Sequence, residues 1–412
     1  MNTLLDYNET KKILEKYNQE HLLNFFEELT KTEQEDLLKQ ISEIDFEQLN
    51  NLYTSLVKKE QKSNDKIDTI EYIDKMKISE NKRQELEQKG ADLIKQNKLA
   101  AVTMAGGQGT RLGHNGPKGT FELFPGKSLF SILAESLKKA CNKYQTTIEW
   151  YIMTSEENND ETISFFERNS YFQYKKQAVH FFKQGKLPLV NKNGKILLEE
   201  KGKIKLAADG NGSIFVSMLK NGIIEDMKKK NIEWMFIGSV DNCLLKMIDP
   251  IFLALTEEKK VLAATKSIVK ANPKEKVGVF CRRNGKPSVV EYSEISEEMA
   301  EKKDENGELV FGESHIMCNM FNIKLIQQVG NEKLKYHVAF KKSDYINEEG
   351  KKVKAEEPNC YKFESFIFDM FERVDNILIM RTKREEEFAP VKNKEGVDSP
   401  ETARQLYLNQ NK

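Results

Sequence analysis

The chain has 412 residues, of which 39% are hydrophobic and 32% are charged. Lysine plus arginine and aspartate plus glutamate each total 65, so no net charge attracts nucleic acid or an anionic membrane to the surface as a whole. The apolar runs are far shorter than the roughly 20 residues that cross a bilayer, and the N-terminus lacks a signal peptide's apolar core. We therefore expect a cytoplasmic globular protein without nucleic-acid or membrane partners.

The five cysteines argue against two kinds of site. They are widely separated, they include no CxxC pair and their number is odd, which disfavours both a disulfide framework and a structural zinc site. Reduced and mostly buried thiols are expected at Cys141, Cys243, Cys281, Cys318 and Cys360.

Residues 1–95 predict a helical N-terminal region. Glycine and proline are almost absent, and apolar residues recur at helical spacing, as at Leu22, Phe26 and Leu29. Thr32 followed by Glu35 matches a capping box, which predicts that a helix begins there.

Residues 96–392 predict an α/β domain. Short apolar runs at 99–104, 148–154, 179–182 and 234–240 alternate with polar helical segments, which is typical of a mostly parallel mixed sheet with helices on both faces. A hairpin is expected over 277–295 because Asn284-Gly285 separates two strand-like runs. Residues 363–371 favour a helix, and 393–412 form a short C-terminal tail with little apolar content.

A glycine-rich loop follows the first predicted strand. It reads MAGGQGTRLG over 104–113, followed by Pro117-Lys118-Gly119. Its glycines allow main-chain N–H groups to approach phosphate oxygens, while Arg111 and Lys118 add positive charge. Such a loop can orient a triphosphate and stabilise departing pyrophosphate. The competing interpretation is a strand-to-helix turn with two solvated basic residues.

Two better-known glycine motifs do not fit these residues. The dinucleotide-binding pattern needs a small residue at position 112, where Leu112 stands. Gly126-Lys127-Ser128 resembles the end of a P-loop, but the first glycine of that motif would fall at Phe121. Neither a Rossmann enzyme nor a P-loop ATPase is predicted.

The string GGQGTRLGxxxPKG resembles the signature of the UDP-sugar pyrophosphorylases, most of all the eukaryotic-type UDP-N-acetylglucosamine pyrophosphorylases. Similar segments follow in the same order along the chain, including FFKQGKLP at 181–188, ADGNGS at 208–213, SVDN at 239–242, FESFIFDMF at 363–371 and EFAPVKN at 387–393. The resemblance implies a glycosyltransferase-A-like nucleotide-binding fold, a helical N-terminal region and a small C-terminal β domain. Most of that β domain would be missing from this sequence, so a monomer is expected.

The resemblance also implies an activity. A sugar 1-phosphate would be joined to the α-phosphate of UTP with release of pyrophosphate, and UDP-N-acetylglucosamine is the first choice of product because Thr110-Arg111-Leu112 resembles that branch. UDP-glucose, UDP-galactose or a broad range of UDP-sugars is the alternative within the class. A nucleotide-sugar-binding protein without catalysis and a purely structural α/β protein are the alternatives outside it.

The family motifs carry over a set of site residues. The implied nucleotide-binding residues are Ala105, Gly106, Gly107, Gln184 and Gly210; the sugar-binding residues are Asn211, Gly278, Glu291, Asn319, Lys362, Phe366 and Phe368; and the catalytic cations are Arg111, Lys118 and Lys392. For the DGNG turn and the aromatic run, an ordinary turn and a core segment are the competing interpretations.

Asp241 is the candidate metal ligand. It ends the apolar run 234–240, at the carboxyl edge where ligands of open α/β sheets collect. Mg²⁺ takes carboxylate and phosphate oxygens and retains waters, so one aspartate plus the nucleotide phosphates would suffice. The competing interpretation is an aspartate that caps the next helix. No general base is expected, because the attacking phosphate is already ionised near neutral pH.

Overall fold

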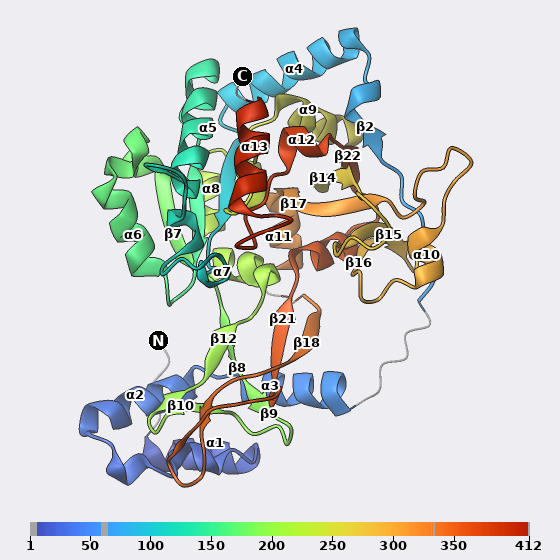
Figure 1. Ribbon diagram of the computed structural model, residues 1–412. Helices are drawn as coiled ribbons and strands as arrows, with labels where there is room; N and C mark the ends of the chain where they lie inside the picture. Colours follow the sequence, from blue (N-terminus) through green and yellow to red (C-terminus); the bar gives the residue numbers. More distant parts are fainter. Residues whose placement is uncertain (1–5, 59–64, 331, 333, 411–412) are drawn as a thin grey trace. The chain divides into compact units, whose positions relative to one another are not determined.

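The computed structural model describes residues 6–58, 65–330, 332 and 334–410. Contacts between Cα atoms group the chain into two compact units (Figure 1). Unit 1 combines 1–64, 185–213 and 334–367, and unit 2 combines 65–184, 214–333 and 368–412. The expected domain boundaries at 95 and 392 stay a prediction, because these units record contacts alone. No helix within the described ranges is long and apolar enough to cross a membrane.

Unit 2 is built around a mixed sheet. Along its main path, neighbouring strands are parallel except where β17 pairs with β13 and β14. The predicted mostly parallel sheet is therefore confirmed. The order along its main path is β2 (Ile73–Asp74), β22 (Leu378–Arg381), β14 (Ala263–Val269), β17 (Glu313–Asn322), β13 (Trp234–Ser239), β3 (Leu99–Met104), β6 (Trp150–Thr154) and β7 (Val179–Lys183).

Helices cover both faces of this sheet (Figure 1). Neighbouring residues of a strand point to opposite faces of the sheet. Trp150 and Tyr151 of β6 therefore show which helices pack on each face. The Trp150 side chain joins an apolar cluster with α4 (Glu80–Lys95), α5 (Leu129–Tyr144) and α9 (Pro250–Lys259). The Tyr151 hydroxyl donates a hydrogen bond to Asp226 of α8 (Ile223–Lys229). Every residue of β3 and β6 is buried, as their continuous apolar runs predict.

The predicted hairpin branches from the sheet. β15 (Val279–Arg283) and β16 (Lys286–Val290) pair antiparallel, and β15 also pairs with β17 and β1 (Ile67–Asp68). Asn284 and Gly285 have φ of +52° and +83°, which suits a two-residue hairpin turn.

The remaining α-helices and strands of unit 2 are β4 (Glu122–Phe124), β5 (Lys127–Ser128), α6 (Asn159–Arg168), α7 (Ile214–Lys220), α10 (Glu297–Glu301), α11 (Ile323–Val329), α12 (Arg384–Glu387) and α13 (Pro400–Gln410).

In the described part of unit 1, helices pack on three small sheets. Leu22, Leu37 and Leu49 share an apolar cluster with Ile204 and Phe363. Its helices are α1 (Tyr7–Lys16), α2 (Lys31–Ser42) and α3 (Phe46–Tyr53). Its strands are β8 (Lys186–Pro188), β9 (Val190–Asn191), β10 (Leu198–Glu200), β11 (Lys203–Ile204), β12 (Leu206–Ala208), β18 (Tyr336–Lys341), β19 (Tyr345–Ile346), β20 (Lys352–Val353) and β21 (Cys360–Ser365).

Two local predictions were wrong. Helix α2 begins at Lys31 with Thr30 and Glu33 as its capping box, because the same Thr-x-x-Glu spacing occurs two residues before Thr32 and Glu35. The helix expected over 363–371 is instead the end of strand β21 followed by a 3₁₀ segment, Ile367–Arg373. Phe363 pairs with Val338 in the β18–β21 ladder, and the run of aromatic residues concealed this alternation.

Candidate active site

The glycine loop leaves the end of β3 and is held by one buried side chain. The Ala105 N–H donates to the Met153 carbonyl at 2.7 Å, which continues the β3–β6 pairing into the loop. The Asn158 amide nitrogen then donates to the Ala105 carbonyl at 2.9 Å and lies 3.4 Å from that of Gly107. The Asn158 amide oxygen accepts the Ser155 N–H at 2.8 Å. Sequence reasoning missed Asn158; its signal was a polar residue shortly after a buried strand.

Gln184 packs against the loop at Gly106. A Cβ atom added at Gly106 would lie 2.7 Å from Gln184 Oε1, so only glycine fits there without displacing the amide. Gln184 follows β7, and its N–H donates to the Thr154 carbonyl at 2.9 Å. A Cβ atom added at Gly107 would meet nothing within 4 Å. The two glycines therefore differ in what surrounds them.

The loop folds back on itself and carries Lys118. The Gly109 N–H donates to the Gly116 carbonyl at 2.9 Å, and the Lys118 N–H donates to the Gly107 carbonyl at 3.0 Å. Arg111 lies on the exposed part of the loop and has no ion pair or side-chain hydrogen bond to the described residues. The structure thus places Lys118, but not Arg111, against another predicted site residue.

That residue is Asp241, which follows β13, the parallel neighbour of β3. Lys118 Nζ lies 3.1 Å from Asp241 Oδ2, and the two side chains are only 18% and 13% exposed. Burial by itself raises the pKa of Asp241, but the charges of Lys118 and Lys392 lower it below its ordinary value. The carboxylate is therefore ionised at neutral pH.

Lys392 is brought to Asp241 by the main chain. The Val391 N–H donates to the Asp241 carbonyl at 2.9 Å, and Asn242 donates to the Glu387 carbonyl at 2.8 Å while accepting the Ala389 N–H at 2.9 Å. Lys392 itself is 44% exposed, with Nζ 3.8 Å from an Asp398 oxygen. Sequence reasoning missed the role of Asn242 in holding this segment.

A cluster of buried charges holds the start of the 387–392 segment in place. Lys266 is fully buried and lies 2.9 Å from Asp249 and 2.5 Å from Glu387, and Lys75 lies 3.1 Å from each of these carboxylates. Burial opposes the charge of Lys266, but the two carboxylates raise its pKa above the ordinary lysine value. The four charges compensate one another and fix Glu387, which precedes the Ala389–Lys392 stretch.

The predicted sugar residues of unit 2 converge on the start of β15 and the middle of β17. A Cβ atom added at Gly278 would lie 3.1 Å from a Glu291 carboxylate oxygen, so these two residues are close. The Gly278 carbonyl accepts the His315 N–H at 2.9 Å. Asn319 is fully buried two residues beyond a bulge in β17, and Phe368 is 6% exposed.

The other predicted residues belong to unit 1. Gly210 has φ of +91°, and a Cβ atom there would lie 2.2 Å from the Ser365 carbonyl oxygen. The Asn211 amide oxygen accepts the Ile367 N–H at 2.8 Å, and the Phe366 ring lies 4.7 Å from the His337 ring. Lys362 pairs with Glu364 at 2.8 Å.

Asp241 has the donor chemistry that Mg²⁺ requires, although it stands alone. No group of three or more His, Cys, Asp or Glu side chains able to hold a metal ion occurs in the described part of the chain. An ionised carboxylate suits a Mg²⁺ ion that takes its other ligands from substrate phosphates and water. The residues therefore fit a metal delivered with the nucleotide better than a dedicated protein cage.

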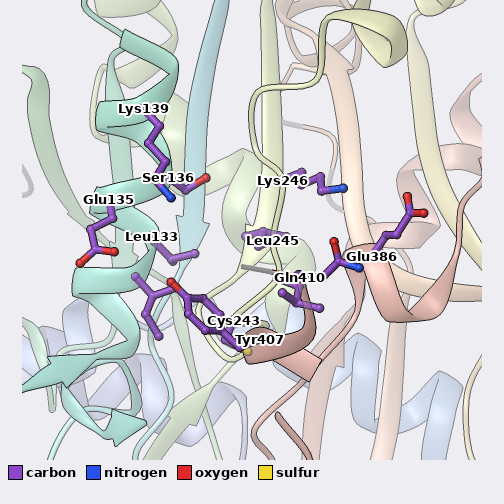
Figure 2. A pocket seen from close by; sticks show the side chains of 12 residues that line it. Leu133, Glu135, Ser136, Lys139, Cys243, Leu245, Lys246, Glu386, Tyr407 and Gln410 are labelled. Carbon is purple, nitrogen blue, oxygen red and sulfur yellow. The ribbon is translucent and has the colours of Figure 1, made fainter. Parts of the chain in front are cut away.

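One surface pocket lies elsewhere. Figure 2 shows Ser136 and Lys139 of α5 on one side of it and Lys246 and Glu386 on the other. Its volume is about 170 Å³. None of the described residues that line it is a predicted site residue. It is therefore not part of the candidate active site.

Comparison with known proteins tests the resemblance. The model of the family described as UTP--glucose-1-phosphate uridylyltransferase matches residues 46–398. The chain belongs to this family. A Xenopus tropicalis protein named UDP-N-acetylhexosamine pyrophosphorylase-like protein 1 is 37% identical, with 96% of this chain and 82% of that protein covered. The UDP-N-acetylglucosamine pyrophosphorylase of Saccharomyces cerevisiae is 33% identical, with 97% and 89% covered.

A solved structure supports the same family and the fold. The uridine diphosphate N-acetylglucosamine pyrophosphorylase of Trypanosoma brucei, solved with an inhibitor, aligns with a TM-score of 0.86 at 30% identity, covering 100% of this chain and 86% of that one. The expected mixed α/β fold and the suspected family are both confirmed by this likeness. The family acts on UTP and a sugar 1-phosphate.

Proposed function

We propose that this chain is a uridylyltransferase that joins N-acetylglucosamine 1-phosphate to UTP, forming UDP-N-acetylglucosamine and pyrophosphate. One observation carries the proposal: Lys118 of the glycine loop pairs with Asp241 at the end of the adjacent parallel strand. The names of the yeast and trypanosomal relatives support N-acetylglucosamine as the sugar.

In the proposed reaction, an oxygen of the sugar phosphate attacks the α-phosphorus of UTP. A new phosphorus–oxygen bond forms while the bond from the α-phosphorus to the bridging oxygen breaks, and pyrophosphate leaves with the electron pair. The nucleophile is already ionised near neutral pH, so positioning and charge stabilisation are what the protein must supply.

The glycine loop suits the leaving group. Main-chain N–H groups around Gly106 and Gly107, with Arg111 and Lys118, would bind the β- and γ-phosphates and stabilise their growing charge. Gln184, packed on Gly106, would place its amide against the uracil, where it can both donate and accept.

Asp241 and Lys392 suit the reacting centre. Asp241 is the proposed Mg²⁺ ligand, and the bound ion would supply charge that neutralises the phosphate oxygens. Lys392 lies beside Asp241 and is 44% exposed, so its ammonium can reach an incoming phosphate. Within unit 2, we assign the sugar to Gly278, Glu291, Asn319 and Phe368. The roles that the family motifs imply for Gly210, Asn211, Lys362 and Phe366 of unit 1 stay predictions.

A second candidate substrate has one observation in its favour. The description of the matching family names glucose 1-phosphate as the sugar substrate, so formation of UDP-glucose is the alternative reaction. It would use the same nucleotide and phosphate residues and would differ only in the sugar contacts.

The test is pyrophosphate release from UTP and Mg²⁺ with a panel of sugar 1-phosphates, compared with the Lys118→Ala variant. Release with N-acetylglucosamine 1-phosphate, lost in the variant, is the expected result. Release with glucose 1-phosphate alone would replace the substrate and keep the mechanism. Binding of nucleotide sugar without release under any condition would favour the non-catalytic alternative.

A further inference from the structure

His315 lies among the proposed sugar residues and has no part in the mechanism above. It belongs to β17 at a bulge: Thr265 of β14 is opposite Asn319 and Ser267 is opposite His315, so the pairing shifts between them. Met317 inside this bulge has φ of +56°, unusual for a residue other than glycine. A β-bulge changes the direction of nearby side chains, and bulges often lie next to active sites.

The hydrogen bonds around Asn319 fix how His315 is protonated. Asn319 Oδ1 accepts from the Thr265 hydroxyl at 2.9 Å and lies 3.1 Å from His315 Nε2. The Asn319 amide nitrogen faces the Met317 sulfur at 3.7 Å, where a donor is favourable and an oxygen would be repelled. With Oδ1 toward the imidazole, Nε2 must carry the hydrogen.

A neutral imidazole protonated on Nε2 has a free lone pair on Nδ1. Burial, together with the nearby charge of Lys392, lowers the pKa of His315 to about 4 despite the bond to Asn319. The ring is therefore neutral at physiological pH. Nδ1 has no hydrogen-bond partner among the residues that the structure describes, and the side chain is partly exposed.

Aromatic side chains pack around the ring of His315. The centroids of Phe280 and Phe368 lie 5.4 and 5.7 Å from that of the imidazole, both nearly perpendicular to it. Its main chain bonds Gly278, which is in turn close to Glu291. A single acceptor within aromatic walls suits a group with one N–H donor and a methyl, which is the chemistry of an acetamide.

We propose that His315 is a specificity-determining residue that accepts, at Nδ1, a hydrogen bond from the acetamide N–H of an N-acetylated sugar. The inference rests on the proposed function and adds to it the residue that recognises the 2-substituent. Asn319, which is fully buried, positions His315 through its side-chain oxygen, 3.1 Å from His315 Nε2.

Titration calorimetry with UDP-N-acetylglucosamine and UDP-glucose tests this assignment on the wild type and two variants. His315→Phe keeps a ring but removes the acceptor, whereas the amide of His315→Gln can donate to Asn319 and still accept from the ligand. The preference for the N-acetylated ligand should fall about tenfold in the Phe variant, the size of one unpaired buried hydrogen bond, and recover in the Gln variant. The affinity for UTP should not change.

His180→Phe is the matched control, because His180 pairs with Glu149 at 2.6 Å, and none of its hydrogen-bond or ring-stacking partners among the described residues is a predicted site residue. An unchanged preference in His315→Phe overturns the inference while leaving pyrophosphate release by the wild type, and so the proposed function, intact. A wild type that releases no pyrophosphate with any sugar 1-phosphate overturns the proposed function instead.

Nitrogen-15 NMR of the wild type keeps the inference testable if His315→Phe does not fold. The His315 Nδ1 resonance, assigned from its absence in His315→Gln, should move on addition of UDP-N-acetylglucosamine and move less with UDP-glucose. Equal movement with both ligands, or none with either, would contradict the assignment.

Discussion

The phosphate side and the sugar side of the candidate site are built in different ways. On the phosphate side, one continuous stretch from β3 to Lys118 folds on itself through its own main-chain hydrogen bonds and meets Asp241 on the next strand. On the sugar side, Gly278, His315 and Phe368 come from three distant segments and meet because of strand register and a bulge. The conformation of the phosphate side therefore depends mainly on bonds within one stretch of chain, whereas the sugar side depends on contacts between distant segments.

The largest effect is expected from Asp241→Asn. Removing the charge of Asp241 takes away the ion-pair partner of Lys118 and the proposed metal ligand, so pyrophosphate release should fall at least 10²–10³-fold, about 3–4 kcal/mol. Initial rates at saturating UTP and Mg²⁺ measure it. Asp226→Asn, on α8, should retain the wild-type rate; an active Asp241→Asn enzyme would remove Asp241 from the phosphate side.

Asn158→Ala should weaken the phosphate side without touching a substrate. The variant leaves the Ala105 carbonyl without its buried donor, at a cost of about 1–3 kcal/mol. We expect a lower melting temperature together with a raised KM for UTP. A lower melting temperature with normal UTP kinetics would mean that Asn158 supports the fold alone.

The two loop glycines offer a matched pair. Gly106→Ala forces a Cβ atom to within 2.7 Å of Gln184, whereas Gly107→Ala meets nothing within 4 Å. The first should raise the KM for UTP about tenfold, or about 1.4 kcal/mol, and the second should change it less. Equal effects would show that phosphate access, rather than the contact with Gln184, explains why glycine occupies position 106.

The smallest effect concerns pH and belongs to the sugar side. Because the pKa of His315 is lowered to about 4 in the folded protein, the unfolded chain binds the extra proton first as pH falls below about 6.5. This residue therefore reduces stability progressively between about pH 6.5 and 4. The melting temperature should drop less from pH 7 to pH 5 in His315→Gln than in the wild type, and an equal drop would argue against a lowered pKa of His315.

The same contrast explains which parts of the fold and of the candidate site could be predicted from the sequence. The strands at 99–104 and 234–240, the Asn284-Gly285 turn and the glycine loop carry local signals, and each lies where it was predicted. Asn242 and His315 carry none, and Asn158 carries only its place shortly after a buried strand, because the roles of all three depend on contacts with distant segments. The strand within 363–371 was missed because aromatic residues conceal its alternation and because its pairing with β18 is a long-range property.

The bonds of Asn242 have a consequence for exchange with solvent. The amides of Ala389 and Val391 bond to Asn242 and Asp241, so neither can exchange its hydrogen for deuterium until the 387–391 segment lifts from the end of β13. The same opening separates Lys392 from Asp241. The deuterium uptake of two backbone amides therefore reports how often Lys392 leaves the neighbourhood of Asp241, in a protein carrying no substrate at all.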